Sequence, residues 1–329
     1  GAGSRGFHER RDIKPMIQAN GVSKRFASVE ALRELSLQLP RGGVFGLVGS
    51  NGAGKSTLLR LLSGVYQPSS GLVLLDGVPL YDNPQAKGCV VYLSDDPYLP
   101  VSSTLRSMAK CYAAAYPRFS HDYLQGLVRM LQLNDRAPLG RFSKGMRRQA
   151  ALALALACQT DYLLLDETFD GLDPVMRALA KQLLYAEVER RQLGVALTSH
   201  SLWELEDTCD QLALLHQGGL VFQSEIQNLK TSLFKVQLAF SAPFGREVFQ
   251  GLSVLEFNQQ GSVATAIVRG DRAEATARLR ALSPLLLELL PLSLEEVFVH
   301  EMGALGYHFD PASLFSKEET QQDGGEPRS

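Results

Sequence analysis

The sequence is poor in cysteine, and its cysteines are scattered. The four of them form no Cys-x-x-Cys pair: Cys89, Cys111, Cys158 and Cys209. This spacing gives no support to a zinc site or a thioredoxin-like redox site. Scattered, unpaired cysteines are typical of a reducing compartment, so we expect the chain to work in the cytoplasm.

Long hydrophobic runs and an excess of one charge are also missing. The apolar stretch 150–158 is among the longest, and it falls well short of the ~20 residues that a membrane-spanning helix needs. No secretory signal is visible. The formal net charge is -2, so no overall attraction to nucleic acid is expected. With 45% hydrophobic and 21% charged residues, the 329-residue chain suits one large or two ordinary globular domains.

One glycine-rich segment has the spacing GxxxxGK[ST] of a phosphate-binding loop. It consists of Gly49, Ser50, Asn51, Gly52, Ala53, Gly54, Lys55, Ser56 and Thr57. The apolar run Val44–Val48 precedes it, so a buried strand leads through the loop into a helix. Glycines let successive N–H groups curl around phosphate oxygens, and the helix N-terminus adds partial positive charge. Lys55 can reach the outer phosphates, and the Ser56 hydroxyl can bind Mg²⁺. A chance glycine turn explains this strand–loop–helix order less well.

A second segment ends a hydrophobic strand with two carboxylates. Tyr162–Leu165 is followed by Asp166 and Glu167, and ligands of open α/β sheets bind at this end of a strand. Asp166 is placed to hold the Mg²⁺ shell through water, and Glu167 to polarise the water that attacks the γ-phosphate. Alone, the pattern also fits a solvated strand end; together with the phosphate loop it favours a nucleotide site.

A third segment, Arg141–Gln149, precedes an apolar helix. Ser143 can cap this helix, and Gly145 leaves its first turn open to an anion. Lys144 adds a positive charge. By itself this is a capped basic helix start, but its place between the other two segments favours contact with a phosphate.

The arrangement of these segments predicts an α/β fold with a P-loop NTPase core. Residues 14–223 are expected to form one α/β domain around the phosphate loop, in which Met16–Phe26 and Ala31–Leu39 make an antiparallel hairpin layer. Residues 97–158 form an inserted helical subdomain. Continuously apolar strands predict a parallel sheet covered on both faces. The further strands expected are Val44–Val48, Leu72–Leu75, Val90–Leu93, Tyr162–Leu165, Val195–Thr198 and Gln211–His216.

The rest of the chain has a different pattern. Residues 224–305 predict a small accessory α+β domain, with a turn at Asn258–Gly261 and a capping-box sequence at Ser293–Glu296. Its expected strands and first helix are Phe234–Phe240, Leu252–Phe257, Ser262–Val268 and Asp271–Leu282. Residues 1–13 are expected to be a flexible arm, and the polar tail 306–329 to be disordered.

Five motifs in this order resemble the nucleotide-binding subunit of an ABC transporter, over residues 16–223. They are the phosphate loop, the Phe-Ser-Lys-Gly-Met segment, the strand ending in Asp166-Glu167, Asp170–Asp173 and Thr198-Ser199-His200. The family signature is Leu-Ser-Gly-Gly-Gln, so Ser143 and Gly145 match while the three other positions depart. The Ser-Lys-Gly-Met form, Tyr116–Phe119 and Ser293–Phe298 resemble the branch that serves ABC-2-type exporters, particularly YtrB-like ATPases.

The resemblance implies that two subunits, identical or different, meet head to tail and sandwich two ATP molecules. Ser143, Lys144 and Gly145 of one subunit would then contact the γ-phosphate held by the other. His200 would contact the γ-phosphate and orient the attacking water, and Phe26 would stack on adenine. Without the resemblance, a lone histidine after a strand is more often structural, and Phe26 is core or surface filler. The loop Asp170–Asp173 would run along the dimer seam.

One position departs from the family in an informative way. The loop after Val90–Leu93 normally carries a glutamine that touches Mg²⁺ and the membrane partner, and here Asp95 aligns with it. A carboxylate is a good ligand for Mg²⁺, so metal contact is expected to persist, with extra negative charge beside the phosphates. The apolar group Tyr98–Val101 follows, and we expect it to be exposed and to dock a coupling helix of the permease.

The function expected from this resemblance is ATP hydrolysis that drives a separate multi-span membrane permease, with export suggested by analogy. The chain would lie at the inner face of the cell membrane and would bind ATP and Mg²⁺. A soluble ABC-type ATPase acting on nucleic acid or ribosomes is the alternative. A short globular insert, one cassette and a near-neutral charge argue against it. An unrelated P-loop kinase would have no role for the Phe-Ser-Lys-Gly-Met and Thr-Ser-His motifs.

Overall fold

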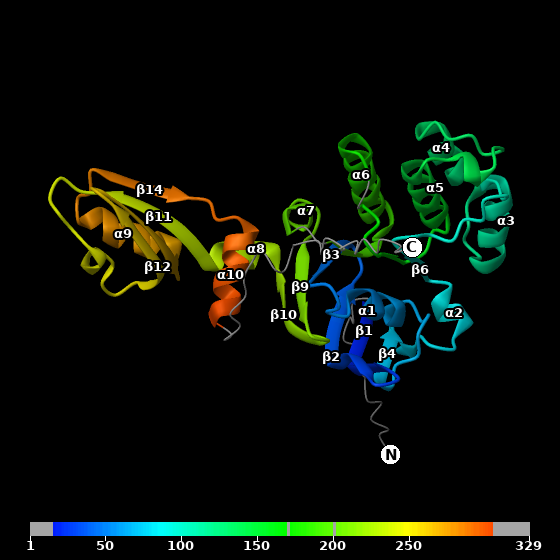
Figure 1. The fold of residues 1–329 in the computed structure, drawn as a ribbon, viewed down its shortest axis with the longest axis horizontal. Helices are drawn as coiled ribbons and strands as arrows, with labels where there is room; N and C mark the ends of the chain where they lie inside the picture. Colours follow the sequence, from blue (N-terminus) through cyan, green and yellow to red (C-terminus); the bar gives the residue numbers. More distant parts are fainter. Residues whose placement is uncertain (1–15, 170–171, 200–201, 305–329) are drawn as a thin grey trace, which may run out of the picture. The chain divides into compact units, whose positions relative to one another are not determined.

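The computed structural model describes residues 16–169, 172–199 and 202–304. The chain divides into two compact units (Figure 1). The first reaches Leu229 and the second begins at Lys230, so the division falls inside α8 (Ile226–Ser232). The predicted arm 1–13 and tail 306–329 lie outside the described residues.

The first unit contains an antiparallel sheet in the order β2-β1-β4-β5. Its strands are β1 (Met16–Phe26), β2 (Val29–Pro40), β4 (Ser70–Leu75) and β5 (Val78–Pro79). The predicted hairpin is confirmed, because β1 pairs with β2 from Met16↔Pro40 to Phe26↔Val29. Segment β4 is a strand as expected, but it pairs antiparallel with β1 rather than joining the parallel sheet.

A six-stranded sheet in the order β10-β9-β3-β8-β7-β6 forms the centre of the first unit. The predicted parallel sheet is confirmed: only β10 runs antiparallel, beside β9. Because the other strands are parallel, their carboxyl ends meet at one edge. The strands are β3 (Gly43–Val48), β6 (Val90–Leu93), β7 (Tyr162–Leu165), β8 (Gly194–Thr198), β9 (Gln211–His216) and β10 (Gly219–Glu225).

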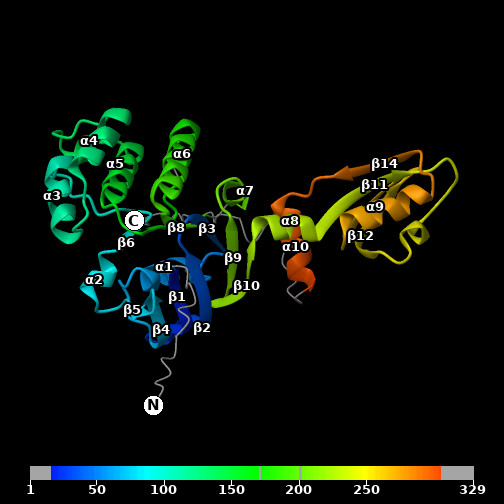
Figure 2. The ribbon, with the colours of Figure 1, turned by 180° about the vertical axis from the view of Figure 1, so that it is seen from behind.

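Helices cover these sheets. Helix α1 follows the phosphate loop, and its four leucines are buried in a core cluster that includes residues of both sheets. Helices α3, α4 and α5, which come between β6 and β7 in chain order, pack together, as both ribbon views show (Figures 1 and 2). All three lie within the segment 97–158, for which the sequence predicts a helical subdomain. The helices are α1 (Lys55–Leu62), α2 (Pro84–Lys87), α3 (Leu105–Ala115), α4 (His121–Met130), α5 (Lys144–Ala157), α6 (Pro174–Arg191) and α7 (Leu202–Glu206).

The second unit is a four-stranded antiparallel sheet in the order β12-β13-β11-β14. Alternate residues of β11 and β13 are buried with Ala275 and Leu279 of α9. Strand β14 was not predicted. The predicted turn at Asn258–Gly261 is shorter than expected, because β12 continues to Gln260, which pairs with Val263. The elements are β11 (Leu233–Ala239), β12 (Ser253–Gln260), β13 (Val263–Arg269), α9 (Arg272–Ala281), β14 (Leu286–Leu290) and α10 (Leu294–Ala304).

The core of the second unit depends on Phe249, which is 2% exposed and lies edge-to-face against Phe257 at 5.9 Å. We expect Phe249→Ala to lower the free energy of unfolding of this unit by about 3–5 kcal/mol, because it removes a buried ring and leaves a cavity. Hydrogen exchange should then be faster in β11 and β13. The control Leu285→Ala, at a residue 73% exposed, should change stability by no more than about 0.5 kcal/mol. Equal exchange in both variants would contradict this core assignment.

Candidate nucleotide site

The phosphate loop joins β3 to α1 at the carboxyl edge of the central sheet. Gly54 is the N-cap of α1 and has φ 101°, a left-handed conformation that favours glycine. A Cβ there would lie 2.6 Å from Leu32 Cδ2 and 2.7 Å from the carbonyl oxygen of Ala31. Gly49 is likewise packed against the carbonyl oxygen of Leu215. Glycine is therefore required by crowding as well as by backbone conformation.

Lys55 stabilises the curled loop. Its side chain is buried, and Nζ donates hydrogen bonds to the carbonyl oxygens of Gly49 at 2.7 Å and Ser50 at 3.2 Å. The first turn of α1 contains no acidic residue. The partial positive charge of the helix N-terminus is therefore not neutralised locally, as an anion site requires.

Asp166 is a buried carboxylate that directly follows β7. Only 2% of the residue is exposed, yet three hydroxyl groups donate to it. Ser56 Oγ and Thr198 Oγ1 both bond to Oδ1 at 2.9 Å, and Tyr92 OH bonds to Oδ2 at 2.9 Å. Burial of a carboxylate is unfavourable unless hydrogen bonds compensate for lost water, and these three do so. The structure thus brings together the predicted metal residues Ser56 and Asp166.

Sequence reasoning did not select Tyr92 or assign a role to Thr198. The Thr-Ser-His motif could have pointed to Thr198, because this residue belongs to it. For Tyr92, the only feature in the sequence that pointed to the site was its position near the end of a strand. Burial, and then the Asp166 carboxylate, raise the pKa of the Tyr92 phenol well above its usual value. The phenol therefore keeps its proton and serves as a donor. Arg60 Nε in turn donates to Tyr92 OH at 3.2 Å.

The predicted base Glu167 has a backbone conformation unusual for its residue type. Its φ is 48°, in the left-handed region that non-glycine residues rarely adopt. The N–H of Glu167 donates to Thr198 Oγ1 at 2.8 Å, which holds the chain in this conformation. Strained residues of this kind gather at functional sites, where neighbouring contacts determine the direction of the side chain.

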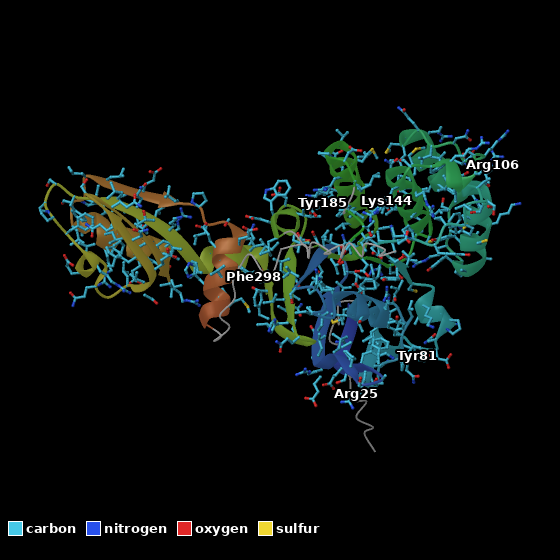
Figure 3. The ribbon with its side chains drawn as sticks, viewed as in Figure 1. Arg25, Tyr81, Arg106, Lys144, Tyr185 and Phe298 are labelled. Carbon is cyan, nitrogen blue, oxygen red and sulfur yellow. The ribbon has the colours of Figure 1, made fainter. Side chains whose placement is uncertain are left out.

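The start of α5 has the features predicted from its sequence. Ser143 is the N-cap, and its Oγ accepts a hydrogen bond from the N–H of Met146 at 3.2 Å. Ser143 and Lys144 are exposed, and Figure 3 labels Lys144. A Cβ at Gly145 would meet only Ser143 Oγ, at 3.9 Å. This helix N-terminus is open to an anion that approaches from outside.

Asp95 lies in a different environment from Ser56 and Asp166. Its Oδ1 accepts a hydrogen bond from the N–H of Asp96 at 2.8 Å, and its carbonyl oxygen accepts one from Arg148 Nη2 at 3.2 Å. In the described part of the chain, no hydrogen bond joins Asp95 to Ser56 or Asp166. Metal contact by Asp95 stays a prediction. Asp95 helps to line a cavity of about 240 Å³ with Asp96, Pro97, Phe142, Lys144, Arg147 and Arg148.

The apolar group after Asp95 is only partly exposed. Tyr98 is 86% exposed and Val101 64%, as expected for a docking surface, but Leu99 is only 2% exposed. The expectation for Leu99 was wrong. Its side chain is buried, and its carbonyl oxygen accepts a hydrogen bond from Arg147 at 2.9 Å.

Phe26 forms part of an aromatic and cationic group at the end of β1. Its ring is 39% exposed and lies edge-to-face with Tyr66 at 5.4 Å. Lys24 Nζ lies 5.0 Å from the Phe26 ring centroid. An exposed ring fixed by such contacts is a suitable platform for a planar base, and adenine stacking stays a prediction.

Two predicted elements cannot be placed fully. His200 lies outside the described residues, as do Asp170 and Gly171 of the predicted seam loop. The end of that loop is described: Asp173 caps α6, and its Oδ1 accepts hydrogen bonds from the N–H groups of Val175 and Met176, each at 3.0 Å.

The donor set fits Mg²⁺ better than a metal that needs a protein cage. Among the described residues, no three His, Cys, Asp or Glu side chains are grouped to hold a metal ion. Mg²⁺ usually keeps several waters and binds through one or two protein groups plus substrate phosphates. The adjoining hydroxyl of Ser56 and carboxylate of Asp166, beside the phosphate loop, meet that requirement.

None of the helices in the described ranges has the length and apolar character that crossing a membrane would require.

Comparisons with known proteins agree on one family. A family profile described as ABC transporter matches residues 32–170. The ABC transporter ATP-binding protein YtrB of Bacillus subtilis (strain 168) is 30% identical over 289 residues, covering 88% of this chain and 98% of YtrB. Human ATP-binding cassette sub-family A member 10 is also 30% identical, over 73% of this chain, but the match spans only 15% of that longer protein.

Solved structures show the same fold. The ATP-binding subunit of an ABC transporter matches 65% of this chain and 92% of its own, with TM-score 0.61 and 24% identity. An ATP-binding cassette solved as a dimer in a post-hydrolysis state with ADP and Pi matches 64% of this chain and 99% of its own, with TM-score 0.58 and 20% identity. The chain therefore belongs to the family of ABC transporter ATP-binding proteins and is an ATPase.

Proposed function

We propose that two ATPase subunits, of which this chain is at least one, close around ATP and drive a separate membrane permease. The observation that carries this proposal is the exposed start of α5. Ser143, Lys144 and Gly145 form a phosphate-binding helix end that is open to an approaching anion. A second subunit can supply the nucleotide for it.

The chemistry follows from the residues at the strand ends. The N–H groups of residues 49–55 and Lys55 hold the β- and γ-phosphates. Ser56 and Asp166 hold Mg²⁺, which neutralises phosphate charge when bound. Glu167 accepts a proton from the attacking water, and Thr198 fixes its backbone. His200 orients the same water, as the family motif implies, and Phe26 stacks on adenine.

The permease partner would contact the surface beside Asp95. Tyr98 and Val101 have exposed apolar side chains there. Pro97, which precedes Tyr98, lines the same cavity as Arg147 and Arg148. The protein cbiO1 of Clostridium perfringens, which has a similar fold, is described as part of the ABC transporter complex cbiONQ. We infer a similar assembly at the inner face of the cell membrane, with export as its direction on analogy with the ABC-2-type branch. Action on nucleic acid or ribosomes is not favoured.

Glu167→Gln tests the general base. The amide cannot accept the proton, so hydrolysis should fall by about 10²–10⁴-fold while ATP still binds. The closed dimer should then accumulate with ATP, which size-exclusion chromatography with light scattering would detect. Glu189→Gln makes the same change at an exposed residue of α6 and should leave the rate unaltered. A wild-type rate in Glu167→Gln would rule out the assigned role.

Mixing two inactive variants tests whether each ATP site is built from the phosphate loop of one chain and the start of α5 of another. Lys55→Ala removes the cation of the phosphate loop, and Gly145→Asp places a carboxylate where the γ-phosphate of the partner should bind. Each variant alone should be inactive. In a mixed dimer, one site combines the intact loop of one chain with the intact α5 of the other. In a homodimer of this chain, ATPase activity should therefore reappear on mixing, whereas a P-loop kinase acting as a monomer would show no recovery.

Asp95→Gln tests the departure from the family. Removing one negative charge near the phosphates should raise turnover, and loss of a carboxylate ligand should raise the Mg²⁺ concentration needed for half-maximal rate. Both are measured in a steady-state ATPase assay with titrated Mg²⁺. Asp96→Asn removes a charge from the next exposed residue and is the matched control. If Asp95→Gln changes neither quantity, Asp95 has no role at the metal.

A further inference from the structure

We propose that Tyr92, held by Arg60, is a positioning residue that fixes Asp166 in the orientation needed for Mg²⁺. This inference rests on the proposed metal role of Asp166. It concerns two side chains outside the five family motifs, both within the first unit.

The two oxygens of the Asp166 carboxylate have different partners. Oδ1 accepts from Ser56 and Thr198, each at 2.9 Å, and so lies beside the hydroxyl that completes the metal pair. Oδ2 accepts from Tyr92 at 2.9 Å. Tyr92 therefore anchors one oxygen and leaves the other directed at Ser56.

Strand pairing places Tyr92 next to Asp166. Strands β6 and β7 are parallel, with Tyr92 opposite Leu164 and Leu93 opposite Leu165. The N–H of Asp166 also donates to the carbonyl oxygen of Leu93 at 2.8 Å. The backbone of Asp166 is thus fixed to β6, and the Tyr92 hydroxyl fixes its side chain to the same strand.

Arg60 determines the direction in which the phenol proton points. A tyrosine hydroxyl has one proton, whereas the arginine guanidinium can only donate. Because Arg60 Nε donates to Tyr92 OH at 3.2 Å, the phenol proton is directed at Asp166. The hydrogen bonds therefore run one way, from Arg60 to Tyr92 to Asp166, and each polarises the next.

Arg60 is itself held in place by aromatic rings. Its guanidinium carbon lies 5.7 Å from the Tyr66 ring centroid and 6.0 Å from that of Tyr92. Arg60 and Ser56 lie four residues apart on α1, so one face of this helix carries both the metal-binding hydroxyl and the start of the anchor. The metal-binding hydroxyl and the start of the anchor are therefore positioned by the same helix.

The competing interpretation is that Tyr92 only fills space between β6 and α1. Phenylalanine would then serve equally well, because its ring has the same shape. With a positioning role, loss of the hydroxyl leaves Oδ2 of a buried carboxylate without its donor, and Asp166 can rotate away from Ser56. The two interpretations differ in metal affinity, because only the positioning role predicts that Tyr92→Phe weakens metal binding.

The test measures Mn²⁺ binding to the full chain by electron paramagnetic resonance, with a non-hydrolysable ATP analogue present. Tyr92→Phe should weaken Mn²⁺ binding by about tenfold, equivalent to about 1.4 kcal/mol. Binding of the analogue without metal should be unchanged. Tyr81→Phe makes the same change at a partly exposed residue of the first unit, labelled in Figure 3, and should leave Mn²⁺ affinity at the wild-type value.

Arg60→Met provides a second, independent variant, because it removes the donor and keeps an unbranched stem. It should weaken Mn²⁺ binding by less than Tyr92→Phe. The double variant should be no weaker than Tyr92→Phe alone, since Arg60 acts through Tyr92. Additive losses would overturn this order of action.

Asp166→Asn separates failure of this inference from failure of the proposed metal role. If Asp166→Asn weakens Mn²⁺ binding and both Tyr92→Phe and Arg60→Met leave it unchanged, the positioning role is overturned and the metal role stands. If Asp166→Asn also leaves Mn²⁺ affinity unchanged, both are overturned.

Discussion

A buried carboxylate held by three hydroxyl groups is the interaction on which the rest of the site depends. Asp166 lies among apolar strands, where an ionised group without partners would be strongly destabilising. Its donors come from α1, β6 and β8, so these three elements must be correctly placed before the charge is compensated. The central sheet and the phosphate loop are therefore specified together, because the same hydrogen bonds serve both the fold and the nucleotide site.

The site combines rigid and open parts. The phosphate loop is packed tightly, with Gly54 against the hairpin strand β2 and Gly49 against β9. The start of α5 is open by contrast, with Ser143 and Lys144 exposed. This difference fits a site in which the phosphate loop is already formed in each chain, while the start of α5 meets its phosphate only when two chains associate. In the proposed dimer, binding energy would then be available for closing the two subunits around ATP.

Local sequence was sufficient for the features that depend on neighbours in the chain. The phosphate loop needs glycines at fixed spacing after an apolar strand. The alternation of polar and apolar residues predicts the β1–β2 hairpin. Strand β14 was not predicted because a leucine-rich run without β-branched residues is compatible with either a helix or a strand. Its pairing with β11 makes it a strand in the structure. Tyr92 was missed because its partner Asp166 is 74 positions away, and only the β6–β7 register brings them together. Leu99 was misjudged because burial within a loop depends on packing that the sequence does not display.

The spacing of Ser56 and Arg60 on α1 restricts how the site can move. The two residues lie about 6 Å apart along one rigid helix, and each is linked to Asp166, one directly and one through Tyr92. A small shift of α1 along its axis changes both links together. Rotation of α1 about its axis instead swings both side chains away from the carboxylate at once. Either movement therefore disturbs both links to Asp166 at once, so α1 and this carboxylate are coupled through two separate contacts.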